Sequence, residues 1–105
     1  MTTRYEIKRR ESPFQSKVIK AGKAHGWLVV KVVCESENGW PDLECIRGGR
    51  TVRIETKRPD QKGELHPNQI RRHKDIRGHG GEAYVGDSLE QAIDIFKSTG
   101  PLIQV

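Results

Sequence analysis

Two short runs in the middle of the chain alternate apolar and polar positions, the period of a half-buried β-strand. They lie within residues 39–46 and 51–57, and the turn at 47–50 between them carries the Gly48-Gly49 pair, which is typical of a two-residue hairpin turn. With the turn centred on the two glycines, one side of the hairpin is apolar. Its opposed pairs are Leu43 with Ile54 and Cys45 with Val52. The pattern therefore predicts one buried hairpin face.

The other side of the same hairpin carries charges. The register places Asp42 opposite Glu55 and Glu44 opposite Arg53, and Lys57 follows Glu55 on the same face. Opposed carboxylates repel each other, so a divalent cation is the simplest partner to offset them, and Mg²⁺ often takes one or two protein carboxylates. The hairpin alone leaves one alternative open, an exposed and solvated face on which Lys57 forms a salt bridge with one acid.

The remaining apolar positions predict three helices and two further strands. Their expected places are a helix that Ser12 caps and Gln15 closes as a capping box, a strand at 27–33, a helix at 65–78, a strand at 82–85 and a helix from 89. The 27–33 run is apolar on both faces, which indicates a central strand. The order predicts an α/β fold with a mixed central β-sheet flanked by helices. The apolar tail 102–105 fits either an edge strand or a contact with a second subunit.

Length and charge limit the functional classes. The 105 residues suffice for one domain, expected over 11–105, behind a basic arm at 1–10. No run is apolar enough for a membrane span, the charged start lacks a secretory signal, and two cysteines make no disulfide framework, so we expect a cytoplasmic protein. The net charge of +5 favours a polyanionic partner such as nucleic acid. Acids clustered within a basic protein suit a cation held between protein and phosphate.

Several short motifs follow one another along the chain in a characteristic order. Pro41-Asp42, followed after a hairpin by Glu55-Thr56-Lys57, resembles the PD-(D/E)xK nuclease signature. Three further motifs accompany it: Glu11-x-x-x-Gln15, Gly39-x-Pro41-Asp42-Leu43 and Leu65-x-Pro67-x-Gln69. The ordered set, over roughly residues 11–86, resembles the VRR-NUC family. The small size is similar to that of its stand-alone phage and bacterial members.

The resemblance implies a restriction-endonuclease-like core that cleaves DNA with Mg²⁺ or Mn²⁺, in a homodimer that resolves four-way (Holliday) junctions. By that resemblance Asp42 and Glu55 match the metal-binding acids, Lys57 the catalytic lysine and Gln69 a glutamine near the active site. Glu11 matches the helix acid that completes the metal site, and the carbonyl of Thr56 is a candidate further ligand. Two simpler roles stay open: Glu11 also suits a helix dipole, and Gln69 also suits a helix cap.

Polar and basic residues around these motifs are candidate DNA contacts, although each one separately also fits a solvated surface position. They are Gln15, Arg50, Arg53, Arg58, Lys62, Arg71, Arg72 and Lys74. Three alternatives remain at this point. One is a nucleic-acid-binding module without catalysis, the second is a nuclease of flap or nicking type, and the third is a small structural or toxin-neutralising partner protein.

Overall fold

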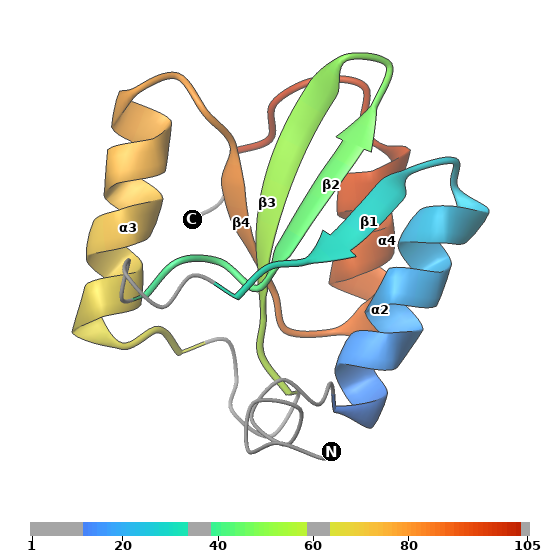
Figure 1. Cartoon of the computed structure of the whole chain (residues 1–105), viewed down its shortest axis with the longest axis horizontal. Coiled ribbons are helices and arrows are strands. Elements are labelled where there is room, and N and C mark those ends of the chain that lie inside the picture. The colour runs from blue at the N-terminus through green and yellow to red at the C-terminus, as the bar shows by residue number, and fades with distance from the viewer. Residues whose placement is uncertain (1–11, 34–38, 59–63, 104–105) are drawn as a thin grey trace, which may run out of the picture.

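The computed structural model describes residues 12–33, 39–58 and 64–103 (Figure 1). The predicted arm at 1–10, Glu11 and Lys62 lie outside these residues. In chain order the described elements are α2 (Pro13–Ala24), β1 (Leu28–Lys31), β2 (Leu43–Arg47), β3 (Arg50–Thr56), α3 (Pro67–Gly78), β4 (Ala83–Gly86) and α4 (Leu89–Lys97). These three helices and one mixed four-stranded sheet confirm the predicted α/β class and element order.

The sheet has the strand order β1-β2-β3-β4. β1, β2 and β3 form an antiparallel meander, and β4 lies parallel to β3 after a crossover through α3. Within the hairpin, Leu43 pairs with Ile54 and Cys45 with Val52, which confirms the predicted register. Gly48 and Gly49 have φ values of 58° and 81°, so both turn positions need the left-handed backbone that glycine adopts readily.

β1 lies at the edge of the sheet, so the expected central position is wrong. Its side chains Leu28 and Val30 are 60% and 44% exposed, whereas Val29 between them is buried in the core. Apolar residues on both faces of this strand therefore do not mean that both faces are covered. Among the described helices, those that pack on the sheet near β1 lie against the face of Val29.

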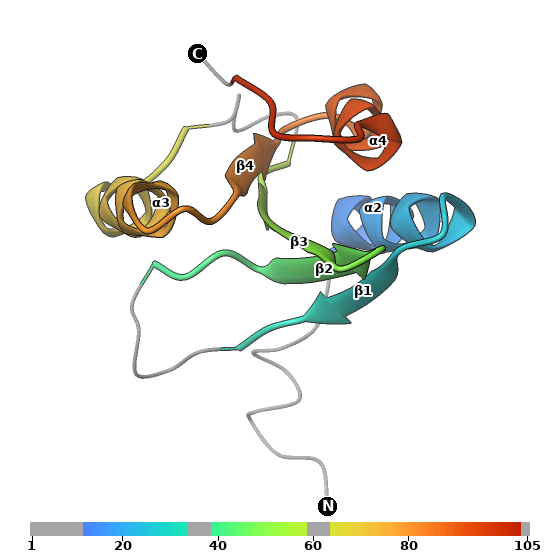
Figure 2. The same ribbon diagram turned by 90° about the horizontal axis from the view of Figure 1, so that it is seen from above.

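One face of the sheet holds the core. Helices α2 and α4 pack side by side against this face (Figure 2). The buried cluster there includes Val18, Trp27, Val29, Leu43, Cys45, Val52, Ile54, Tyr84, Ala92, Ile95 and Phe96. Helix α3 contacts β4 and lies apart from α2 and α4 (Figure 2). Among the described helices, none is long and apolar enough to cross a membrane.

Candidate active site

The hairpin brings Asp42 and Glu55 together where β2 begins and β3 ends. Asp42 directly precedes β2, and its backbone carbonyl accepts a hydrogen bond of 2.7 Å from the amide of Val32. The carboxylate is held as well, because Asp42 Oδ2 accepts hydrogen bonds from the amide of Thr56 at 3.0 Å and from the hydroxyl of Thr56 at 2.9 Å. Both the backbone and one carboxylate oxygen of Asp42 are thus fixed by the sheet.

Glu55 is only 4% exposed, so the alternative of an exposed and solvated face does not hold at this position. Burial raises the pKa of Glu55 to about 9, with further increases from the charge of Asp42 and from a hydrogen bond with that carboxyl, while Lys57 lowers it. Its Oε1 is buried and has no hydrogen-bond partner within the part of the chain that the structure describes. The structure therefore places a carboxyl group where its ionised form needs a positive partner.

Lys57 lies beside this acid pair, on the face of the hairpin that carries Glu55. Its side chain is also buried, at 7% exposure, and Lys57 Nζ is 3.9 Å from Glu55 Oε2. The salt bridge of the simpler interpretation does form, but inside the protein, where removing two charges from water is costly. Asp42, Glu55 and Lys57, which lie on two different strands, are thus gathered in one place.

A glutamine from the core-side helix supports Asp42 indirectly. Gln15 of α2 is 6% exposed, and its Nε2 donates to Thr56 Oγ1 at 2.9 Å. The Thr56 hydroxyl in turn donates to Asp42, as given above. The backbone amide of Gln15 donates to the capping Ser12 hydroxyl, but its side chain reaches Thr56 rather than closing the expected capping box. Gln15 therefore reaches Asp42 through the Thr56 hydroxyl, from the core side of the sheet.

A second glutamine, from α3, supports Glu55 directly. Gln69 Nε2 donates to Glu55 Oε2 at 3.0 Å, and Gln69 Oε1 accepts from the backbone amide of His66 at 2.9 Å. The same side chain thus caps its helix and contacts the acid, which joins the two roles left open by the sequence. Gly39 makes this approach possible: its φ is 88°, and a Cβ there would lie 2.6 Å from the backbone carbonyl carbon and oxygen of Asn68.

His73 was not selected from the sequence as a site residue, because it fitted the apolar face of its helix. It is 1% exposed, and both ring nitrogens are buried without a hydrogen-bond partner. Burial lowers its pKa to about 4; the charges of Arg77 and Lys57 lower it as well, and that of Asp42 raises it. Its spacing of one helical turn from Gln69 is the signal that links it to the acids.

The predicted basic contacts are not gathered in one place. Arg50 lies five residues before Glu55, roughly 17 Å along the strand, and its guanidinium is held by Glu82 at 2.8 Å and by the carbonyls of Ser98 and Gly100. Arg53 is on the acid face and pairs with Glu44 at 3.2 Å.

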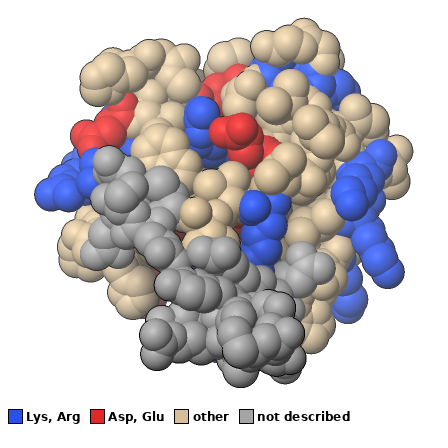
Figure 3. Space-filling view, viewed as in Figure 1, with Lys and Arg blue, Asp and Glu red and all other residues tan. Residues whose placement is uncertain are grey.

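The other candidates lie on or near α3, where Arg71 and Lys74 are exposed and Arg72 pairs with Asp75 at 3.3 Å; Arg58, also exposed, follows Lys57. On the face seen in Figure 3, basic side chains form separate groups over α3, the sheet and α2, with acidic side chains between them. On this face the described basic side chains form separate islands rather than one continuous patch.

The acid pair suits a hard divalent cation. Within residues 12–33, 39–58 and 64–103, no three His, Cys, Asp or Glu side chains are arranged to hold a metal ion, and the expected third acid, Glu11, lies outside these ranges. Mg²⁺ needs only one or two carboxylates when substrate phosphate and water complete its shell. The unpartnered Glu55 Oε1 and the raised pKa of that carboxyl are both consistent with such an ion.

Comparison with known proteins agrees with this geometry. A solved structure described as a VRR_NUC domain matches 83% of this chain and 94% of its own, with a TM-score of 0.72 and 27% sequence identity. No family model and no curated protein sequence matches the chain. The structural similarity confirms the expected restriction-endonuclease-like fold and the resemblance on which it was based.

Proposed function

We propose that this chain, a member of the VRR-NUC family by its structural similarity, is a metal-dependent DNA endonuclease that hydrolyses phosphodiester bonds. The observation that carries the proposal is the buried carboxyl of Glu55 next to the half-buried Asp42, with the buried Lys57 beside it. An arrangement of two carboxylates and an ammonium inside a protein costs stability unless a ligand compensates it. A cation with a bound phosphate would provide that compensation.

The residues of the site have different roles in this proposal. Asp42 and Glu55, with the carbonyl of Thr56, would hold Mg²⁺ or Mn²⁺, which when bound supplies Lewis acidity to the scissile phosphate and to an attacking water. Lys57 presents a positive charge to the phosphate as negative charge develops on it, or positions the water. Gln69 fixes the orientation of Glu55, and Gln15 does the same for Asp42 through the Thr56 hydroxyl.

For the substrate we propose branched DNA, with four-way junctions cut by a homodimer. The exposed apolar side chains of Leu28, Val30 and Val33 on and just after β1 support a contact between two copies. A flap or nicking preference is the competing outcome, and it would follow from a different spacing of two sites or from a monomer. Light scattering of the purified protein measures the oligomeric state, and a monomer at cleavage concentrations would exclude the dimer.

The decisive test incubates labelled duplex, flap and four-way DNA with Mg²⁺ or Mn²⁺ and either wild-type protein or Lys57→Ala. We expect Lys57→Ala to lower cleavage by about 10²–10³-fold, as loss of one charge-stabilising group does, while DNA binding is kept. Lys20→Ala, which removes an equal charge from an exposed position of α2, is the matched control and should cleave normally. Wild-type protein that binds DNA but cuts none of these substrates with either metal would instead indicate a binding module.

A further inference from the structure

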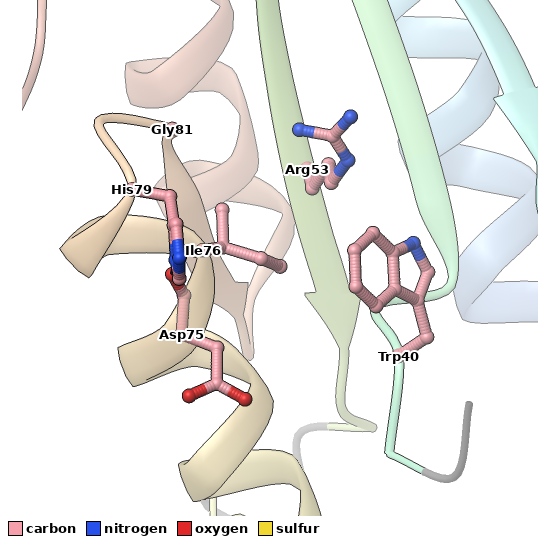
Figure 4. A pocket seen from close by; sticks show the side chains of 6 residues that line it. All are labelled: Trp40, Arg53, Asp75, Ile76, His79 and Gly81. Carbon is pink, nitrogen blue, oxygen red and sulfur yellow. The ribbon is translucent and has the colours of Figure 1, made fainter.

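A pocket of about 390 Å³ lies between the hairpin and the second half of α3. Its lining residues are Trp40, Arg53, Asp75, Ile76, His79 and Gly81. Figure 4 shows Trp40 and Arg53 on one side of the space and the side chains of α3 on the other. The pocket has no part in holding the acids, so the proposed function leaves it unexplained.

The two walls suit a flat aromatic ligand. On the hairpin side, the Arg53 guanidinium lies over the indole of Trp40, 5.6 Å from the ring centroid. On the helix side the apolar Ile76 faces the space (Figure 4). An apolar slot with one aromatic wall favours a planar ring system.

Polar groups at the edge of the pocket indicate which kind of ring. Arg53 Nε is buried and has no hydrogen-bond partner among the described residues, although the same guanidinium pairs with Glu44 through Nη2. The Asp75 side chain is 49% exposed at the pocket and offers carboxylate oxygens as acceptors. A ligand with ring acceptors and an amino group would satisfy both residues, and nucleobases carry both kinds of group.

The pocket is also close to the acids. Trp40 precedes Asp42 by two residues, and Arg53 precedes Glu55 by two residues on the same face of β3. Two residues along a strand span roughly 6.6 Å. A DNA strand with a phosphate at Asp42 and Glu55 therefore has a neighbouring base within reach of the Trp40 indole.

We propose that this pocket binds one unpaired nucleobase of the DNA substrate, adjacent to the phosphate that is cut. The inference rests on the proposed nuclease function and narrows its substrate class. A base in intact duplex is paired and stacked, and removing it from the stack costs a few kcal/mol. The pocket thus favours DNA with unpaired bases beside the cut, such as a flap or an open branch point, over perfect duplex.

The test uses the branched DNA that the wild-type protein cuts, with a single abasic site moved, one nucleotide at a time, past the cut. For wild-type protein we expect one position at which the missing base lowers kcat/KM by about 5- to 100-fold, the range produced by loss of one base–aromatic stack. Trp40→Leu, which keeps apolar bulk without a π face, should cleave intact and abasic substrates equally. Trp40→Phe is the matched variant that should keep the discrimination.

A second variant covers the case in which Trp40→Leu does not fold. His79→Trp fills the pocket from an exposed position and should abolish the abasic discrimination with Trp40 still in place. Wild-type protein that cuts DNA with no sensitive position, or a folded Trp40→Leu that keeps the full sensitivity, overturns the pocket and leaves the nuclease intact. Wild-type protein that cuts no DNA overturns both proposals.

Discussion

The two faces of the β2–β3 hairpin are built from alternate residues of the same strands, yet their energetics are opposite. On one face Leu43, Cys45, Val52 and Ile54 are completely buried against α2 and α4. On the other face Glu55 and Lys57 are nearly as buried, but both carry ionisable groups, and Glu55 Oε1 has no hydrogen-bond partner among the described residues. Burial stabilises the first face and destabilises the second. This contrast is the reason for proposing that the second face binds a ligand.

The largest effect on folding is expected from the apolar face. Leu43→Ala should lower the free energy of unfolding by about 2–5 kcal/mol, because it removes buried methyl groups and leaves a cavity. Urea denaturation measures the change. The cleavage rate per folded molecule should stay that of wild type, and a large loss of that rate in the folded fraction would show that the two faces are coupled.

Metal binding should change the stability only through the hairpin face that carries Glu55 and Lys57. Adding Mg²⁺ or Mn²⁺ to metal-free protein at 100 times the dissociation constant is expected to stabilise the fold by about 2.7 kcal/mol, since the ion binds the native site. The rise in melting temperature should persist in Leu43→Ala, measured against its own lower starting value. Asp42→Asn should show no such rise, and an equal rise in that variant would place the ion elsewhere.

Glu55→Gln should change how the stability of the protein depends on pH. The folded pKa of Glu55, about 9, lies above its ordinary value of 4.5, so the folded protein binds the extra proton between these values. The stability linked to that proton is complete below pH 4.5 and is lost as the pH rises through 9. In metal-free protein, the free energy of unfolding of the variant should therefore rise by about 2 kcal/mol relative to that of wild type between pH 5 and 9. Parallel pH curves for the two proteins would contradict this environment for Glu55.

The smallest effect is expected at His73. Its folded pKa, about 4, lies below the ordinary 6.5, so the unfolded chain takes up a proton that the folded protein refuses between these values. His73→Leu should thus gain about 1 kcal/mol on wild type as the pH falls from 7 to 4, the lower end of the cost of an unsatisfied buried polar group. Thermal unfolding at several pH values measures the difference. If the difference in stability between the two proteins became smaller as the pH falls, the imidazole would be charged in the folded protein.

Local patterns were sufficient to predict the hairpin. The Gly48-Gly49 turn and the strict alternation around it fix the register, so opposed pairs such as Leu43 with Ile54 follow from the sequence alone. The same reasoning placed Asp42 and Glu55 on one face, and the structure brings them together. The edge position of β1 and the exposure of Leu28 could not be predicted in this way. They depend on which strands and helices lie beside β1, and the pattern of residues 27–33 does not carry that information.

The surroundings of the acids could not be read from the strands. Glu55 is buried because α3 lies over it and supplies Gln69, a contact between residues 14 positions apart. Gln15 reaches Thr56 across 41 positions, from a helix on the core side of the sheet. Short motifs identified both glutamines as relevant, but only the packing of two helices shows which acid each one supports. For His73, its spacing of one helical turn from Gln69 is the signal in the sequence, and its burial shows only in the structure.

The close contact of Gly39 with Asn68 has a consequence for the newly made chain. The hairpin can form early from local interactions, and it already contains both carboxylates and the lysine. Helix α3 is synthesised later, and only its arrival against Gly39 delivers the amide of Gln69 to the pair. In the proposed nuclease, the site is thus incomplete until α3 has packed against the hairpin.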